Sequence, residues 1–478
     1  MFSRLKSLIR KVVSRLFPKN LVQKAANVDI AVSDRMSKAI DLWDRIYMNQ
    51  APWLIVEEPN KPNKESLNLG AVIAGEIARL VTVEFKSEII NNDFLQEQYK
   101  NVLDDLRKYV EYGCAKGGLV FKPYIDGNSI AVDYVQADKI FPVAYNSKGE
   151  ITSAVFVEQK RIGKKLYSRL EYHDLQGTDY TITNKAYCNN NAWGGNDKLY
   201  ELGQEVELSA IDEWASLSPV TILGNIDKPL FAYFKVPQAN TEDTSSPLGV
   251  SVFSRAVDLI KQADEQWNRI LWEFEGSELA IDASSDCFKR DEAGNYILPK
   301  GKERLFRAHD FGANETSKAI ETFSPSIRDT SLFNGLDNIL KRIEFNCNLS
   351  YGTISDPQSV DKTATEVISS KQREYSNIKD TQISLQNALE HLVYAMSVLG
   401  SIYGLCNTNY EISYNWDDSI VVDKEKELAS MQADVAAGIL RPELYIMKKY
   451  GVTEEEALKM MPQSTNDSDV DDDIDGDE

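Results

Sequence analysis

Two short patterns carry residue types that could bind phosphate or a metal ion, and each lacks a part that the chemistry requires. Gly70 and Gly75 have the spacing of a phosphate-binding loop, but Glu76 and Ile77 stand where Lys and Ser or Thr would bind phosphate and magnesium. The acidic run 471–476 (DDDIDG) matches the start of a calcium loop, but the printed sequence stops before the position of the bidentate Glu. We therefore predict a helix at the glycines and a solvated tail at the acidic run.

The residue types that most often form metal sites or activated nucleophiles are few and scattered. No Ser or Cys stands in a pattern with a nearby His that would activate it, and the Cys residues form no C-x-x-C pair. Free thiols of this kind are typical of a reducing cytoplasm. We predict no catalytic residue, no metal site and no cofactor, with a metal-dependent nuclease built on clustered carboxylates as the enzymatic alternative. The residues concerned are His173, His309, His391, Cys114, Cys188, Cys287, Cys347 and Cys406.

The overall charge limits how the chain can meet nucleic acid. Of its 478 residues, 53 are Lys or Arg and 74 are Asp or Glu, which gives a net charge of −21. Proteins that hold DNA by bulk electrostatics are basic, because the phosphates are negative. Any DNA contact is therefore expected to be sparse or non-adhesive. The length predicts about two to four domains.

The polar segment 351–361 (YGTISDPQSVD) connects two helical patterns, and it is the loop that we expect to be functional. After it, Thr363 and Glu366 form the S/T-x-x-E pattern that caps the start of a helix. Apolar residues then recur at helical spacing up to Ile402, which predicts about 60 Å of helix. Two interpretations stay open: one long helix that braces an elongated assembly, or two helices joined near 376–380.

A second helical pattern precedes the loop. From Phe253 to Phe274, apolar residues alternate at 3-4-3-4 spacing for three heptads. This stripe needs helical partners on more than one side, so we predict a homo-oligomeric ring. Tryptophans at helical spacing or at helix ends are predicted to be core or subunit contacts, not a base-stacking platform. They are Trp43, Trp53, Trp267 and Trp272.

The rest of the pattern predicts an α+β fold. Strand signals run from Gly117 to Ala232, with a tight hairpin turn at Asp126-Gly127, and predict an antiparallel sheet packed on earlier helices. The other predicted elements are a basic amphipathic segment at 1–20, helices at 36–54, 66–80 and 93–112, a small mixed insert at 277–325, a strand at 408–418, short helices opened by Pro442 and Thr453, and a disordered acidic tail.

The order of these parts resembles the portal proteins of tailed bacteriophages, in the form found in siphophages. No single segment is a catalytic fingerprint, and the specificity comes from their order and spacing over most of the chain. The segments are MSKAIDLWDRIYMNQAPWL, GGLVFKPYIDGNSIAVDYVQADKIFPV, SPLGVSVFSRAVDLIKQADEQWNRILWEFEGSE, DKTATEVISSKQREY, WDDSIVVDKEKE and GILRPELYIMKKYGVTEEEA.

The resemblance implies a ring, usually of twelve subunits, at one capsid vertex, for DNA packaging and ejection. A separate ATP-driven terminase would pump the DNA, which agrees with the missing nucleotide site. The implied partners are other copies of the chain, the terminase large subunit, the major capsid and scaffold proteins, a head-tail adaptor, and double-stranded DNA that passes with little sequence specificity. The implied location is the virion, after assembly in the host bacterial cytoplasm.

The resemblance also divides the chain into the parts of a portal subunit. The implied parts are a basic N-terminal segment (1–27), an α+β wing (28–246), a first stem helix (247–276), a clip (277–325), a second stem helix (326–350), a tunnel loop (351–362), a long wing helix with a strand (363–423), a helical crown (424–462) and an acidic tail (463–478).

Site residues follow from the same resemblance. The tunnel loop is expected to be free to move and to matter for transport more than for folding, since its polar composition supplies no apolar core. Lone cations of the stem are expected to touch phosphates or to pair with Asp337 and Glu344. The implied residues are Tyr351, Ser355, Asp356, Gln358, Ser359 and Lys362 in the tunnel loop, Lys341, Arg342 and Glu344 in the stem, and Lys300, Lys302, Arg304 and Arg307 on the terminase-facing clip.

A different ring-forming head-tail connector or adaptor protein would also explain the long helices. Such chains are usually much shorter than this one, so a portal is favoured.

Overall fold

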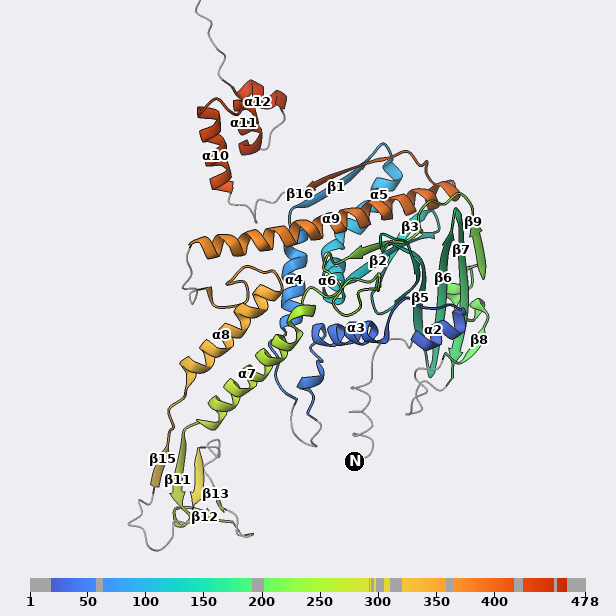
Figure 1. Ribbon diagram of the computed structural model, residues 1–478. Coiled ribbons are helices and arrows are strands. Elements are labelled where there is room, and N and C mark those ends of the chain that lie inside the picture. Colours follow the sequence, from blue (N-terminus) through green and yellow to red (C-terminus); the bar gives the residue numbers. More distant parts are fainter. Residues whose placement is uncertain are drawn as a thin grey trace, which may run out of the picture. The chain divides into compact units, whose positions relative to one another are not determined.

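The computed structural model describes most of the chain, in two compact units, Met1–Trp416 and Asp417–Glu478 (Figure 1). The described residues are 19–56, 63–190, 202–291, 293, 296–297, 305–309, 320–357, 364–416, 424–450 and 454–461. Residues 1–18 of the basic segment predicted at 1–20, the Thr363 cap and the acidic tail lie outside these ranges.

The first unit begins with helices near the predicted positions. The helix predicted at 36–54 ends at Tyr47, because Asn49 takes a left-handed backbone conformation with φ of 56°. The pattern at 93–112 forms two helices that meet at Asp105. The bounds are α2 Lys19–Ala26, α3 Asp34–Tyr47, η1 Pro52–Leu54, α4 Leu69–Thr82, α5 Asp93–Asp104 and α6 Leu106–Lys116.

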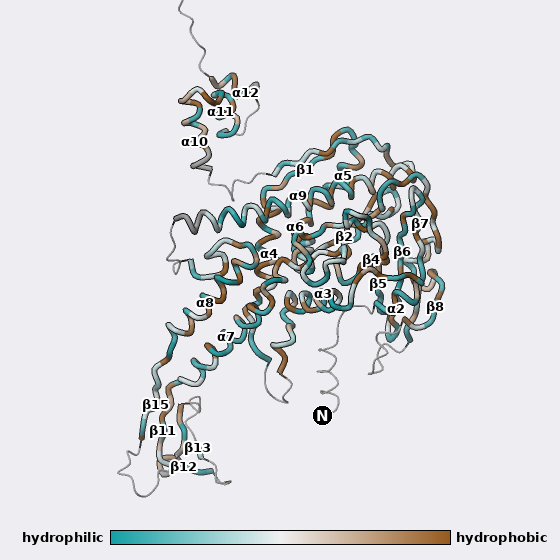
Figure 2. Tube along the Cα trace, in the orientation of Figure 1, coloured by the Kyte–Doolittle hydropathy of each residue, from teal (hydrophilic) through white to brown (hydrophobic). Residues whose placement is uncertain are grey.

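Helix α4 contains the glycines that resemble a phosphate loop. The prediction of a helix at this place is confirmed. A Cβ atom on Gly70 would lie only 2.6 Å from Cγ2 of Ile46, so this glycine lets α4 pack closely on α3. Figure 2 shows α4 as apolar along most of its length, in agreement with its many buried residues.

Antiparallel strands follow the helices, as predicted, but they form two sheets where one was predicted. One has the order β10-β2-β3 and the other β4-β5-β6-β7-β8, with β9 also paired to β7. Asp126 pairs with Ser129, so the hairpin turn centres on Gly127 and Asn128, one residue later than predicted. The bounds are β2 Gly118–Asp126, β3 Ser129–Gln136, β4 Ile140–Tyr145, β5 Ile151–Ile162, β6 Lys165–Gln176, β7 Asp179–Asn189, β8 Gln204–Val206, η3 Leu208–Ala210, η4 Asp212–Trp214, β9 Val220–Leu223 and β10 Ala232–Lys235.

The helical pattern after the polar loop forms one continuous helix, α9 (Ala364–Ile402), of 39 residues. The interpretation of two helices joined near 376–380 is therefore wrong. Leu385, Leu389 and Leu392 are buried in the main core, and Oγ of Ser384 donates to the carbonyl oxygen of Lys235 at 2.5 Å. Helix α9 thus lies against β2 and β10 and joins the second half of the chain to the first.

A two-stranded sheet also joins the second half of the chain to the first. Strand β16 (Glu411–Trp416), which was predicted, pairs antiparallel with β1 (Phe85–Ile90), which was not. The rings of Phe85 and Trp416 stack with their centroids 4.1 Å apart. Both sequence halves therefore contribute to one core.

Two further helices, α7 (Val257–Gly276) and α8 (Asp329–Asn346), pack side by side (Figure 1). Between them in sequence lies a small mixed sheet of order β14-β11-β15, in which β11 pairs parallel with β14 and antiparallel with β15. This agrees with the predicted mixed insert. The bounds are η5 Ser254–Ala256, β11 Ala280–Ser284, η6 Ser285–Cys287, β12 Lys289–Arg290, β13 Tyr296–Ile297, β14 Phe306–His309 and β15 Ile320–Phe323.

The second unit contains three short helices among its described residues: α10 (Lys424–Ala436), α11 (Pro442–Tyr450) and α12 (Glu454–Met460). Pro442 opens α11 as predicted, because its fixed φ suits a first helical turn. Across the described ranges of both units, every helix is too short or too polar to cross a membrane.

Candidate functional site

The paired helices α7 and α8 bury part of the predicted apolar stripe. Ala256, Ile260, Ala263 and Ile270 are buried, and Nε2 of Gln266 on α7 donates to the carbonyl oxygen of Leu332 on α8 at 3.3 Å. Helix α8 is thus one of the helical partners that the stripe requires.

The same pair leaves large apolar side chains exposed. The exposed fractions are 69% for Trp272, 41% for Phe274, 43% for Phe333 and 54% for Phe345. The rings of Phe274 and Phe333 lie in contact, with centroids 6.3 Å apart. Trp272, predicted as a core or subunit contact, is therefore not a core residue of the single chain, whereas Trp43 is 1% exposed and belongs to the core.

Helix α8 ends in a turn that leads into the polar loop. Asn348 has a left-handed φ of 57°, and the amide of Leu349 donates to the carbonyl oxygen of Glu344 at 2.9 Å. The chain then runs back along the helix end, and Leu349 is buried. This reversal places the loop beside the last turn of α8.

The carboxylate of Glu344 holds the start of the loop. Its Oε1 accepts from the amides of Gly352 at 3.1 Å, Ile354 at 2.7 Å and Ser355 at 2.9 Å. Its Oε2 accepts from Oγ of Ser355 at 2.9 Å. Glu344 is 0% exposed, so it does not lie on the helix surface. The expectation that Glu344 lines a channel is therefore wrong, because its own chain covers it.

Helix α9 holds the residues just before this turn. Glu374 accepts from the amide and the hydroxyl of Ser350, at 3.1 and 2.5 Å, and Oγ of Ser370 accepts from the amide of Tyr351 at 3.0 Å. The guanidinium of Arg373 lies 5.6 Å from the ring centroid of Tyr351. Amides of residues 351–356 are thus bound from both sides, by α8 and by α9, and the mobility of the loop stays a prediction.

Of the other residues expected in the loop and the stem, only some lie within the described ranges. Nζ of Lys341 pairs with Oδ2 of Asp337 at 2.7 Å, as expected for a lone cation, and the amide of Asp356 donates to Oδ1 of the same Asp337 at 2.9 Å. Arg342 is exposed. Gln358, Ser359 and Lys362 lie outside the described residues.

The expected cations of the mixed insert are described only in part. Arg307 on β14 is half-exposed, pairs with Oδ1 of Asp282 at 3.2 Å and stacks over the ring of Phe323 at 4.6 Å. Lys300, Lys302 and Arg304 lie outside the described residues.

Helix α7 carries a second buried carboxylate that the sequence analysis missed. Oδ1 of Asp264 accepts from the hydroxyl of Ser66 at 3.0 Å and the amide of Leu67 at 2.9 Å, and Oδ2 accepts from Nε1 of Trp53 at 2.9 Å. Asp264 is 2% exposed. The signal was an acidic residue beside the apolar stripe, which spacing alone does not distinguish from a solvated one.

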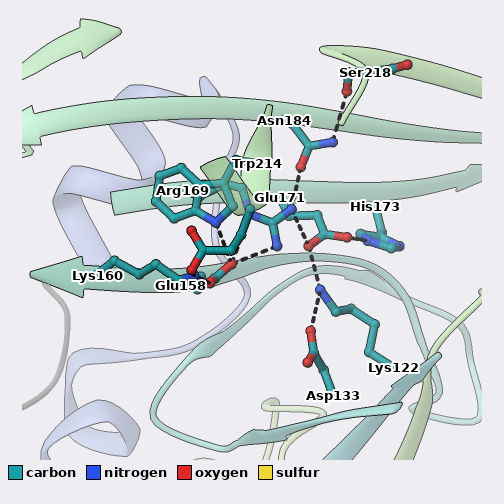
Figure 3. A network of polar contacts seen from close by, with 11 residues as sticks. Lys122, Asp133, Glu158, Lys160, Arg169, Glu171, His173, Asn184, Trp214 and Ser218 are labelled. Atoms are coloured by element: carbon teal, nitrogen blue, oxygen red, sulfur yellow. Dashed lines mark hydrogen bonds and ion pairs between the residues drawn. The ribbon is translucent and has the colours of Figure 1, made fainter. Parts of the chain in front are cut away.

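A buried polar network joins the sheet β10-β2-β3 to the sheet β4-β5-β6-β7-β8 (Figure 3). Glu171 on β6 pairs with Lys122 on β2 at 2.5 Å and with Arg169 at 3.1 Å. Arg169 also binds Oε2 of Glu158 through two nitrogens and Oδ1 of Asn184 at 2.9 Å. Burial alone would raise the pKa of Glu171, but the neighbouring cations outweigh burial and hold that pKa well below its usual value.

The network continues through His173. Its Nε2 lies 2.8 Å from the ionised carboxylate of Glu171, so Nε2 carries the proton and Nδ1 accepts from the hydroxyl of Tyr180 at 2.6 Å. Burial lowers the pKa of His173, which favours the neutral ring. The ion pairs and hydrogen bonds of the network link β2, β5, β6 and β7.

Within the described ranges, no group of three or more His, Cys, Asp or Glu side chains is arranged to hold a metal ion. The glycines of α4 belong to a helix, and Glu76 and Ile77 follow them in the same helix.

Comparison with known proteins assigns the family. The description "Phage portal protein, SPP1 Gp6-like" matches residues 29–469 of the chain. The chain belongs to this portal protein family. The portal family is structural, and membership gives the protein a portal or connector role in a phage-type particle.

Two solved structures are similar to this portal protein at low identity. A chain from the neck of a native GTA particle computed with C12 symmetry has 11% identity and a TM-score of 0.42, and the match covers 90% of this chain and 98% of that one. A chain from the virion of a native gene transfer agent particle has 9% identity and a TM-score of 0.41, with 90% and 97% covered. No curated protein matches the sequence.

Proposed function

We propose that this portal protein forms the oligomeric ring at one capsid vertex through which double-stranded DNA is packaged and ejected. The observation that carries the proposal is the family match over residues 29–469. The proposal includes docking sites for a terminase and for a head-tail connector, assembly in the host bacterial cytoplasm, and a final place in the virion.

Exposed apolar side chains on α7 and α8 support the ring. Trp272 and Phe345 are more than half exposed in the single chain, and large exposed aromatic residues mark protein contacts. We assign both side chains to the interface between neighbouring copies of the chain. The resemblance implies a ring of twelve such copies.

The parts of the chain take the roles that the resemblance implied. Helices α7 and α8 form the stem, the mixed sheet between them forms the clip, and residues 351–362 form the tunnel loop. The wing would comprise 28–246 and 363–423, and the crown 424–462.

The charges of the proposed stem bear on how DNA would pass. Of the described cations on α7, α8 and the residues just before them, Lys341 is paired with Asp337 and Arg328 with Glu273. The others are exposed: Arg255, Lys261, Arg269 and Arg342. A duplex carries one negative charge per about 1.7 Å of its axis, so a basic channel would hold it strongly. Because α7 and α8 carry more acids than cations, we expect the exposed cations to make only transient phosphate contacts.

The clip is the part that would face the terminase. Lys300, Lys302, Arg304 and Arg307 would steer an acidic partner surface toward it, an effect that weakens with salt. Reversing the charges of Lys300, Lys302 and Arg304 should slow packaging at low salt and leave ring assembly intact. Packaging at the normal rate would reject this role.

The test of the proposed function has two parts. Electron microscopy of the purified protein should show a ring with a central channel. Particles produced without the chain should contain no packaged DNA, and the chain supplied from a plasmid should restore it. DNA-filled particles in its absence would overturn the proposal and favour the alternative of a head-tail adaptor.

A further inference from the structure

The carboxylate of Glu344 is buried with hydrogen-bond donors in place of a cation. The side chain is 0% exposed, and in the described part of the chain no Lys, Arg or His lies within ion-pair distance. An ionised group in such a position is costly unless donors compensate it. Four donors do so here: the amides of Gly352, Ile354 and Ser355, and the hydroxyl of Ser355.

The turn after α8 is shaped around this one side chain. Three amides within four residues point at the same oxygen, Oε1, an arrangement that favours an anion. Gly352 has a φ of +89°, and a Cβ atom there would lie 3.3 Å from Pro357. Charge-assisted hydrogen bonds are about twice as strong as neutral ones, so the carboxylate fixes the turn more firmly than an amide would.

Helix α9 fixes the residues before the turn through Glu374 and Ser370. The amide of Asp356 after the turn is bound by Asp337, which lies seven residues before Glu344, on the same face of α8. Residues 350–356 are therefore bound to helix side chains at both ends and in the middle.

We propose that Glu344 is a positioning residue for DNA transport: it makes residues 351–356 a fixed extension of stem helix α8. The start of the tunnel loop then follows α8 as one body and presents a set position to the DNA. This inference rests on the proposed function, because it assumes that the loop faces the channel.

The first test is Glu344→Gln, which keeps the shape and replaces one acceptor oxygen by a donor NH₂ group. Hydrogen exchange on the assembled ring, resolved to single residues by mass spectrometry, should show the amides of Gly352, Ile354 and Ser355 exchanging at least about tenfold faster. Amides within α8 should keep their protection. DNA packaging should fall at least about tenfold, with rings of normal appearance.

The matched control is Glu374→Gln, a carboxylate on α9 that binds Ser350 and none of the three amides. It should speed exchange at Ser350 and leave the amides of 352, 354 and 355 protected. A general loss of stability would instead raise exchange throughout α8 in either variant.

A second variant disturbs the turn from the other side. Gly352→Ala keeps Glu344 but strains the backbone at a positive φ, so it should release the same amides and lower packaging. If Glu344→Gln prevents folding, this variant decides the question.

Three results would overturn the inference: unchanged exchange at the three amides, faster exchange with normal packaging, or loss of the ring in both variants. Failure of the proposed function is distinguishable, since it would appear as DNA packaging without the wild-type chain.

Discussion

Arg328, just before α8, binds Glu273 near the end of α7 through two parallel hydrogen bonds. Nε lies 3.0 Å from Oε1, and Nη2 lies 2.8 Å from Oε2. This bridge joins α7 and α8 at the end where the chain enters and leaves the mixed sheet. The hydrogen bond from Arg328 lowers the pKa of Glu273.

Arg328→Ala should therefore lower the melting temperature slightly at pH 7. Because the folded-state pKa of Glu273 is below its usual value of 4.5, the stabilisation is present above that pH and is lost as the pH falls through the lowered pKa. Thermal melts of both proteins between pH 7 and pH 3 should converge at the acid end. A difference that persists there would show that the bridge acts through packing.

Trp272→Ala should weaken the ring and leave the single chain stable. Its side chain is 69% exposed, so the free energy of unfolding should change by no more than about 0.5 kcal/mol. Light scattering over a series of protein concentrations should show that the Trp272→Ala ring dissociates at a higher concentration than the wild-type ring. The control Trp43→Ala removes a side chain that is 1% exposed and should cost about 3–5 kcal/mol. Normal assembly of Trp272→Ala would remove this residue from the interface.

Arg169→Met should destabilise the first unit. It removes one of the two cations that pair with the buried Glu171 and a cation of Glu158, and because Lys122 remains, the cost should be at most the about 3–5 kcal/mol of a fully broken buried pair. Urea denaturation is the measurement. The matched control is Arg35→Met, whose partner Glu242 lies at the surface, where a pair contributes about 0–1 kcal/mol. Equal effects of the two changes would contradict the role given to the network.

Stability should fall as the pH drops from 7 to 5. Burial lowers the pKa of His391 and His173, so the unfolded chain binds protons near pH 6.5 that the folded chain does not. His391 donates from Nε2 to the carbonyl oxygen of Pro229 at 2.8 Å, a bond that Gln can replace. Urea denaturation of His391→Gln should show a smaller loss over this range than the wild type. An equal loss would assign the effect to other groups.

The sequence by itself determined the elements whose causes are local. The period of apolar residues predicted α7 and α9, Pro442 marked the start of α11, and a glycine turn marked the β2–β3 hairpin. These signals arise between residues a few positions apart, so they survive without knowledge of the fold. The order of the segments also carried the family resemblance.

Only the tertiary structure decided which polar residues are buried and what they bind. In the sequence, Glu344 and Asp264 look like ordinary acidic residues on the surface of a helix. In the structure each binds a loop: the partners of Glu344 are 8 to 11 residues away in sequence, and those of Asp264 are about 200 residues away. Strand β1 found its partner more than 300 residues away. Burial and pairing depend on which surfaces meet when the chain closes on itself, and that is set by distant packing, which local spacing does not encode.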